Sequence, residues 1–431
     1  MPDSIQPTNP DTAVPENASD LEAKVAARAA AIEAKVADKI PAPPKETKLP
    51  KDFVLDCLNR NKVGDAALFC ALFRGKYVFV QEWEKFLYWS GHFWQVDMRS
   101  KRALADSERV CEAYMNAWAE CNDEEGSPLH KKILKRLDSL RSPKGRKDML
   151  ECVTTIDDAP VISYEQLDKQ PYLLATPTGV VDLRTGECSP GKPEQYLLSH
   201  CPTPWRGIDE PCREFEEYLQ TCMDDDHEIK DFIQRLLGYA LLGEKKHHIW
   251  VIMYGPLSRN GKDTLMNIVK RILGKNLHVR IPTNMLMDQK FERDSSQPSA
   301  DMMALRGAKI AYASEAKKRH SLDQAKIKDM TGGGYITARG LTDREMTEWK
   351  QSALIMLLTN YLPKINSDDD GFNARTICIE WPVKFVPNPV REYERKIVYG
   401  MDDRLEKEDS GILAFMVRGC MDVIANNLRI P

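Results

Sequence analysis

The stretch from Ile249 to Leu273 constrains the fold more than any other part of the chain. It opens with an apolar, β-prone run that ends at Tyr254 and is followed directly by Gly255-Pro256. A polar loop then reaches Gly261-Lys262, after which apolar residues return at helical spacing. The stretch therefore predicts a buried strand, a loop bounded by glycines, and an amphipathic helix.

These three parts together have the composition of a phosphate cradle. In such a cradle the loop amides and the positive end of the helix face the phosphates, and a lysine neutralises the β and γ oxygens. We interpret the loop as a site for ATP with Mg²⁺; an ordinary strand-to-helix turn with a surface lysine is the alternative. The residues assigned to the nucleotide are Gly255, Pro256, Ser258, Asn260, Gly261, Lys262, Asp263 and Thr264.

The loop departs from the usual motif in two ways. Five residues separate its glycines, where the usual pattern has four, and Asp263 follows the lysine where Ser or Thr is usual. We therefore assign the Mg²⁺ contact to Asp263 or Thr264, directly or through water.

Bulk properties restrict the function classes. A chain of 431 residues can hold two or three domains, and its formal net charge of −4 means that any contact with nucleic acid must be local. The 11 cysteines form no CxxC pair, which indicates reduced thiols. No apolar run approaches the roughly 20 residues of a membrane span, and the N-terminus lacks a signal-peptide core. We expect a cytoplasmic protein without membrane contact.

Composition shifts predict four segments. Residues 1–50 are expected to be a flexible tail and linker, and residues 51–225 a mixed α+β domain. Residues 226–388 are expected to hold the nucleotide-binding core, and residues 389–431 a C-terminal helical segment with helices over 389–399 and 410–428.

Two features of the N-terminal domain leave alternatives open. Alternating apolar residues between 76 and 96 predict a small antiparallel sheet, whose aromatic side chains form a packed core or, alternatively, stack on bases; we favour the core. The window 130–147 carries eight Lys or Arg and one acid. It is either a contact for a phosphate backbone or a solvated helix face.

Three further buried strands are predicted after the phosphate helix, and polar residues mark their ends. Glu315 ends the strand over 306–316, where an acid can help to hold Mg²⁺ and polarise the attacking water. Asn360 ends the strand over 352–360 and either senses the γ-phosphate or caps the turn before Pro363. Arg375 enters the last strand and either reaches a phosphate of a neighbouring subunit or pairs with the acids at 368–370.

The chain resembles the superfamily 3 AAA+ helicases, in the branch of poxvirus-type and phage or plasmid primase-helicases. The resemblance covers roughly residues 65–430 and rests on seven blocks in order: TPTGVVDLRTGE, FIQRLLGYALLGE, NGKDTL, ASE, KIKDMTGGGYITARG, LLTNYLP and DDDGFNARTICIEWPVKF. It implies an α/β fold with an AAA+ P-loop NTPase core, a mixed α+β N-terminal domain and a C-terminal helical segment. It also implies a homo-oligomeric ring, usually a hexamer, that hydrolyses ATP and translocates on single-stranded DNA in replication.

Positions that match the family's motifs receive the family's roles. Lys262 would be the phosphate-loop lysine, Glu315 the second-motif acid, Asn360 the sensor, and Arg375 the arginine offered to the neighbouring subunit. The segment between acid and sensor carries the family's pore hairpin, so its polar residues would contact DNA: Lys326, Lys328, Arg339, Thr342 and Arg344.

The chain also departs from the family. It has Ala374-Arg375 where the branch often has two arginines, and it ends at Pro431, where relatives often continue into a winged-helix module. Only the tail precedes the helicase-like region, so we expect no priming activity from this chain.

Two other functions remain open from the sequence. A nucleotide-gated DNA-binding scaffold for origin recognition or loading fits the altered loop length and Asp263. A small-molecule P-loop kinase is the third hypothesis, against which the Asn-ended strand and the long hairpin segment argue.

Overall fold

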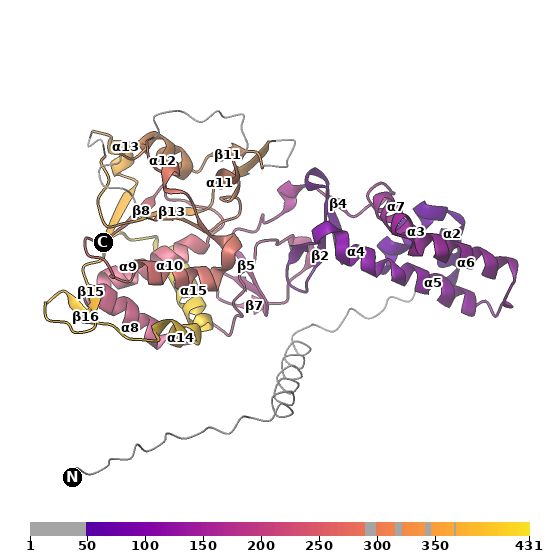
Figure 1. Ribbon diagram of the computed structural model, residues 1–431, viewed down its shortest axis with the longest axis horizontal. Helices are drawn as coiled ribbons and strands as arrows, with labels where there is room; N and C mark the ends of the chain where they lie inside the picture. Colours follow the sequence, from indigo (N-terminus) through magenta and orange to yellow (C-terminus); the bar gives the residue numbers. More distant parts are fainter. Residues whose placement is uncertain (1–48, 289–298, 315–320, 341–345, 366–367) are drawn as a thin grey trace, which may run out of the picture. The chain divides into compact units, whose positions relative to one another are not determined.

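The computed structural model describes residues 49–288, 299–314, 321–340, 346–365 and 368–431 (Figure 1). Residues 49–431 form one compact unit. The tail predicted over residues 1–50 lies almost wholly outside the described residues.

The first part of this unit is a bundle of helices with its own hydrophobic core. Apolar side chains such as Val54, Phe69 and Ile133 are buried inside the bundle. The buried carboxylate of Asp65 accepts a hydrogen bond from the Tyr114 hydroxyl (2.8 Å) and pairs with Arg136, which links three helices. The helices are α2 (Lys51–Asn59), α3 (Asn61–Leu72), α4 (Lys101–Asp106), α5 (Glu108–Ala119), α6 (Pro128–Arg141) and α7 (Pro143–Val153).

The basic window is therefore two helices, because Ser142-Pro143 interrupts it. Proline has no N–H to donate and fits the first position of a helix. The Ser142 hydroxyl accepts the Gly145 N–H (3.0 Å) and so caps the second helix.

Two small sheets precede the central sheet, and the first contains the antiparallel strands predicted between residues 76 and 96. The first, in the order β3-β2-β1-β4, pairs β1 with β2 and β2 with β3 antiparallel, and adds β4 parallel to β1. Phe86, Phe93 and Trp94 are buried, which confirms the packed core. The second sheet is the antiparallel set β5-β6-β7. Their strands are β1 (Tyr77–Val80), β2 (Lys85–Trp89), β3 (Trp94–Val96), β4 (Val161–Ile162), β5 (Leu173–Thr176), β6 (Gly179–Asp182) and β7 (Cys188–Ser189).

The central sheet has five parallel strands in the order β14-β8-β13-β10-β9. All the strands predicted after the phosphate helix are present. Parallel strands need crossover connections, and helices supply most of them here. The strands are β8 (Trp250–Tyr254), β9 (His278–Arg280), β10 (Ile310–Ser314), β13 (Leu354–Thr359) and β14 (Thr376–Glu380).

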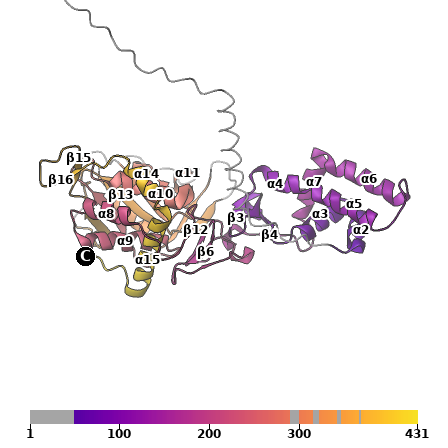
Figure 2. The ribbon, with the colours of Figure 1, turned by 90° about the horizontal axis from the view of Figure 1, so that it is seen from below.

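Helices cover both faces of this sheet (Figures 1 and 2). Val251 and Met253 belong to a cluster with α9, α10 and α15, whereas Trp250 and Ile252 belong to a second cluster with α12 and the β11–β12 hairpin. This alternation along β8 is expected of a strand buried on both sides. The elements are α9 (His227–Leu241), α10 (Lys262–Leu277), α11 (Ala300–Met303), α12 (Gln324–Thr331), α13 (Asp370–Asn373), β11 (Tyr335–Ala338), β12 (Thr347–Lys350) and α15 (Asp409–Asn426).

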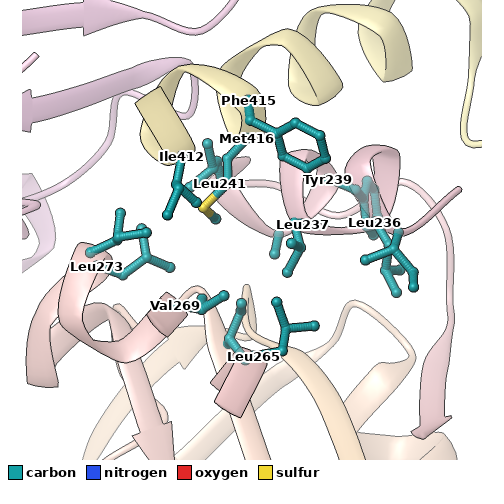
Figure 3. Close-up of a cluster of buried hydrophobic side chains, with 14 of the residues drawn as sticks. Leu236, Leu237, Tyr239, Leu241, Leu265, Val269, Leu273, Ile412, Phe415 and Met416 are labelled. Carbon is teal, nitrogen blue, oxygen red and sulfur yellow. The ribbon is translucent and has the colours of Figure 1, made fainter. Parts of the chain in front are cut away.

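Helices α9 and α15 approach each other closely enough that glycine is required where they cross. Figure 3 shows Leu236 and Leu237 of α9 and Phe415 and Met416 of α15 in one buried cluster with residues of α10. A Cβ on Gly238 would lie 2.1 Å from the Cys420 nitrogen, so no side chain fits there.

One predicted helix is wrong. Residues 389–399 contain the strand β16 (Glu394–Lys396), which pairs with β15 (Lys384–Val386). The reason is local: the Glu394 carboxylate accepts the backbone N–H groups of Val390 and Arg391 (2.9 and 3.2 Å) and stabilises a turn in place of a helix.

The remaining helices are α8 (Arg213–Cys222) and α14 (Met401–Glu406), and short 3₁₀ turns occur at 81–83, 98–100, 164–166, 193–195 and 283–285. Within the described part of the chain, no helix is both long and apolar enough to cross a lipid bilayer.

The close crossing of α9 and α15 gives a stability prediction. Gly238→Ala should lower the free energy of unfolding by about 1–3 kcal/mol or more, because the added methyl overlaps backbone atoms that cannot move aside. Urea denaturation followed by circular dichroism measures this. Gly334→Ala is the matched control, since nothing lies within 4 Å of a Cβ there. Equal stabilities for the two variants would contradict the close packing.

Candidate nucleotide site

The candidate site lies at the carboxyl edge of the central sheet, where β8 and β13 end side by side. Tyr254 and Thr359, their last residues, are in register. The connection after β8 leads to β9, which is the outer strand on one side of the sheet. The connection after β13 leads to β14, which is the outer strand on the other side. Ligands of open α/β sheets bind where neighbouring connections diverge in this way.

Two hydrogen bonds from other elements hold the backbone of the loop after β8. The Tyr218 hydroxyl of α8 donates to the Gly261 carbonyl (2.7 Å), and the Phe385 N–H of β15 donates to the Arg259 carbonyl (2.8 Å). Arg259 itself has a φ of 59°, in the left-handed region that residues other than glycine rarely adopt. Gly261 has a φ of 95° and leads directly into α10, as the sequence predicts.

The side chains of Asn260 and Lys262 fold back over Gly255. A Cβ on Gly255 would lie 1.9 Å from Asn260 Nδ2 and 2.3 Å from Lys262 Nζ. The Lys262 ammonium donates to Asn260 Oδ1 (2.9 Å) and to Asn360 Oδ1 (3.3 Å). Three residues that the sequence assigned to one site are therefore in contact.

Burial lowers the pKa of Lys262 to about 8, and the nearby Asp263 carboxylate opposes part of that shift. Lys262 is only 4% exposed, and the two groups that accept its hydrogen bonds are neutral amides. Burial disfavours the charged form, and the Asp263 carboxylate offsets only part of this effect. An anionic ligand beside the Lys262 ammonium would supply further negative charge and stabilise the charged form of the lysine.

Asn360 does not cap the turn that follows β13. Thr359 holds this turn: its hydroxyl donates to the Tyr361 carbonyl (2.7 Å) and accepts the Tyr361 N–H (3.1 Å). Asn360 is exposed and its side-chain oxygen faces Lys262. The geometry thus favours the first of the two interpretations of Asn360, although the sensing of a γ-phosphate stays a prediction.

The residues predicted to hold Mg²⁺ lie on the first turn of α10. Asp263 is exposed and Thr264 half-buried, and a carboxylate with a hydroxyl is the oxygen donor set that Mg²⁺ prefers. Glu315 follows Ser314, the last residue of β10, but lies outside the described residues. Among the residues the structure describes, no cluster of three or more His, Cys, Asp or Glu could hold a metal. Pro256 and Ser258 are exposed on the loop.

Arg375 is not close to Lys262 in the same chain. It precedes β14, whose first residue Thr376 is in register with Trp250 at the beginning of β8. A five-residue strand rises by roughly 16 Å. Arg375 therefore lies at the amino ends of the parallel strands, whereas Lys262 lies at their carboxyl ends. Arg375 donates to the Lys328 carbonyl (2.8 Å), and the ion pair with Asp369 (2.7 Å) is made by Lys328.

The residues predicted to bind DNA are only partly described. Lys328 pairs with Asp369, which lowers the pKa of that carboxyl, and Lys326 is half-buried on α12. Arg339 follows β11 and its carbonyl accepts the Ser299 N–H (2.9 Å). Thr342 and Arg344 lie outside the described residues.

The arginines of the basic window have structural partners. Arg136 pairs with Asp65, and Arg141 and Arg146 both pair with Glu108. Lys131, Lys135, Lys144 and Lys147 are exposed. Both interpretations of the window stay predictions, and its exposed lysines are the groups most accessible to a phosphate backbone.

Sequence reasoning missed the residues that support the loop from outside. Tyr218 lies 43 residues before its partner Gly261, and Phe385 lies far after Arg259. Neither residue carries a sequence signal for this role, because each acts through one long-range hydrogen bond. Leu257 was also missed: its carbonyl accepts a hydrogen bond from the Asn260 amide (2.5 Å).

Comparison with known proteins finds sequence similarity to viral proteins whose names include helicase and primase. Residues 66–224 match the family described as D5 N terminal like. The mimivirus protein named "Putative helicase L207/L206", from Acanthamoeba polyphaga mimivirus, is 28% identical over 258 residues. The African swine fever virus protein named "Putative primase C962R" is 25% identical over 245 residues.

These relatives are much longer than the chain. The aligned regions cover 59% and 54% of this chain, but only 26% and 24% of the mimivirus and African swine fever virus proteins. The chain thus spans about a quarter of the length of the curated relatives it matches. The apo structure of the NrS-1 C-terminal region superposes with a TM-score of 0.47 at 14% identity, covering 85% of this chain and 73% of that chain.

The close approach of side chains to Gly255 gives a binding prediction. Gly255→Ala should weaken ATP binding about 10-fold or more, because the methyl would displace both Asn260 and Lys262 while leaving the core intact. Isothermal titration with ATP and Mg²⁺ measures the affinity. Gly334→Ala again serves as control. Unchanged affinity in the Gly255 variant, with an unchanged melting temperature, would contradict the geometry.

Proposed function

We propose that the chain is an ATP-hydrolysing DNA helicase or translocase that acts as an oligomeric ring in replication. The observation that carries this proposal is the contact between Lys262, at the beginning of α10, and Asn360, at the end of the adjacent parallel strand. The order β14-β8-β13-β10-β9, numbered along the chain, is 5-1-4-3-2, which supports an AAA+ P-loop core. The similarity to viral proteins named as helicase and primase supports the role in replication.

ATP would bind with its phosphates over Gly255 and against the first turn of α10. The first N–H groups of a helix have no partner within it and attract anions. Lys262 would move its ammonium from the two asparagines to the β and γ oxygens. Mg²⁺, held by Asp263 or Thr264 together with Glu315, would neutralise charge that develops on the same oxygens.

Hydrolysis would need a second copy of the chain. Glu315 would orient and polarise the attacking water, and Asn360 would hold the γ-phosphate end of the site. Arg375 lies at the opposite edge of the sheet and hydrogen-bonds to the Lys328 carbonyl, so it cannot serve the Lys262 of its own chain. It would stabilise the transition state in the neighbour's site, as arginines donated in trans do.

DNA movement would follow from the connection between Arg375 and the hairpin. Arg375 binds the last turn of α12, and α12 leads through three glycines into β11. A change at the subunit interface would thus reach the β11–β12 hairpin, whose tip and flanking Lys and Arg would hold the strand.

Removal of the lysine tests the proposal directly. Lys262→Ala should lower DNA-stimulated ATP hydrolysis about 100-fold or more, because one preorganised charge on the transferred phosphoryl group is lost. Lys270→Ala is the matched control, since this lysine is exposed on the same helix. Phosphate release is the measurement, and normal turnover in the Lys262 variant would refute the site.

A forked duplex separates a helicase from a scaffold. The wild-type chain should displace one strand in the presence of ATP, and the Lys262 variant should bind the fork without displacing it. A wild-type chain that binds DNA and hydrolyses ATP but never separates strands would instead support the nucleotide-gated scaffold.

Mixing two inactive variants tests the shared site. Arg375→Ala should be inactive alone, yet part of the activity should return when it is mixed with Lys262→Ala. Some interfaces then combine an intact loop from one variant with an intact arginine from the other. Phosphate release measured on the reassembled mixture checks this, and a mixture that stays inactive would contradict action in trans.

A further inference from the structure

The arginines of α6 and α7 anchor these two helices on the rest of the helical bundle. Arg136 pairs with the buried Asp65 of α3. Arg141 and Arg146 both pair with Glu108 of α5. Each helix also buries one apolar side in the bundle core. The bundle therefore fixes which side of α6 and of α7 faces solvent.

Four lysines of the same two helices lie on the solvent side. Lys131 and Lys135 are about one helical turn apart, so they share one face of α6 and lie about 6 Å apart along its axis. Gly145 packs against the Ser139 carbonyl, which brings the beginning of α7 against the end of α6. Within the described part of the chain these exposed lysines take part in no ion pair, and we call them the lysine surface: Lys131, Lys135, Lys144 and Lys147.

The charge pattern of the lysine surface differs from that of a helix face that only contacts water. Charges of alternating sign, joined by ion pairs, are typical of such a face. Lys131 and Lys135 are instead like charges at i, i+4 spacing, which destabilises a helix. Neither helix has an acid in its first turn, where the helix dipole favours one, and Lys144 lies in the first turn of α7. A bound polyanion would make these unfavourable placements favourable.

The residue types of the lysine surface fit the phosphates of a duplex better than a single strand. Residues 128–153 contain no Phe, Tyr or Trp, on which the bases of single strands stack. Lysine is a flexible point charge, which suits phosphate contacts that carry no sequence information. The spacing of about 6 Å between Lys131 and Lys135 is close to twice the roughly 3.4 Å per phosphate along each DNA strand.

We propose that the lysine surface binds the phosphate backbone of duplex DNA, independently of nucleotide and of base sequence. The inference goes beyond the proposed function, from which it takes only that the partner is DNA. This contact holds the unopened duplex while the core acts on a separated strand. Asp138, the one acid of the window 130–147, is exposed three residues after Lys135 and weakens the contact.

The experiment is the binding of the full chain to a blunt duplex of about 20 base pairs and mixed sequence. Fluorescence anisotropy without nucleotide, between roughly 50 and 200 mM salt, gives the association constant and its salt dependence. Replacement of all four lysines by alanine should reduce the slope of log K against log salt by about 3 to 4, because each phosphate contact contributes roughly 0.9. At the lowest salt the affinity should fall about 10-fold or more.

The matched control replaces four exposed lysines outside the bundle by alanine: Lys85, Lys169, Lys270 and Lys407. Both fourfold variants carry the same net charge, so a difference between them locates the contact. The control should keep most of the wild-type slope. Equal slopes for the two variants, with melting temperatures like that of the wild type, would overturn the proposal.

A gain of binding tests the lysine surface with a variant whose effect cannot come from misfolding. Asp138→Asn removes the one acid of the window, so duplex affinity should rise about 2- to 5-fold. Asp209→Asn is the control, since it removes an exposed acid elsewhere in the chain and should leave the affinity unchanged. The same affinity in both variants would count against the lysine surface.

A single strand of the same length tests the assignment to duplex DNA. The fourfold variant of the lysine surface should lose little affinity for it, and a loss equal to that for the duplex would overturn the assignment.

The outcomes also separate this inference from the proposed function. A chain that binds duplex through the lysine surface but never hydrolyses ATP refutes only the proposed function. A chain that hydrolyses ATP and separates strands, while both fourfold variants bind duplex alike, refutes only this inference.

Discussion

The burial of β8 on both faces, between β13 and β14, is the constraint on which the site depends. Parallel neighbours fix its register, so that Tyr254 and Thr359 end at the same level of the sheet. The loop that follows must then turn back over the sheet edge, and Asn360 must lie beside it. A one-residue slip in a parallel strand would turn each apolar side chain to the other face, where the cluster does not fit it.

The loop itself is supported by hydrogen bonds from neighbouring elements and from within the loop. Hydrogen bonds from Tyr218 and Phe385 hold its backbone from α8 and β15, and Asn260 holds its own Leu257 carbonyl. Such preorganisation keeps donors aligned before a ligand arrives, so binding costs little reorganisation. Beside this supported loop, the ammonium of the buried Lys262 donates to the exposed Asn360 at the end of β13.

Where the structure differs from what the residue patterns indicate, the cause is a local interaction that the patterns do not predict. Residues 389–399 have helix-compatible spacing, yet the Glu394 carboxylate captures two backbone N–H groups and β15 supplies a pairing partner. Within the basic window, Ser142-Pro143 ends the first helix and begins a second, because proline has no N–H to continue the helix. At residues 389–399 a side-chain contact thus overrode a weak intrinsic helix preference.

The sequence by itself determined the buried strands of the central sheet, the strand–loop–helix around Lys262, and the polar residues that end the buried strands. These features follow from local spacing, because apolar periodicity and glycine reflect the backbone conformation directly. Only the tertiary structure decided that Lys262 donates hydrogen bonds to Asn260 and Asn360. It also decided that Arg375 lies at the amino ends of the parallel strands, and that a glycine is required where α9 crosses α15. These contacts join residues that are distant in the chain, and their geometry depends on how the sheet is ordered and how its helices pack.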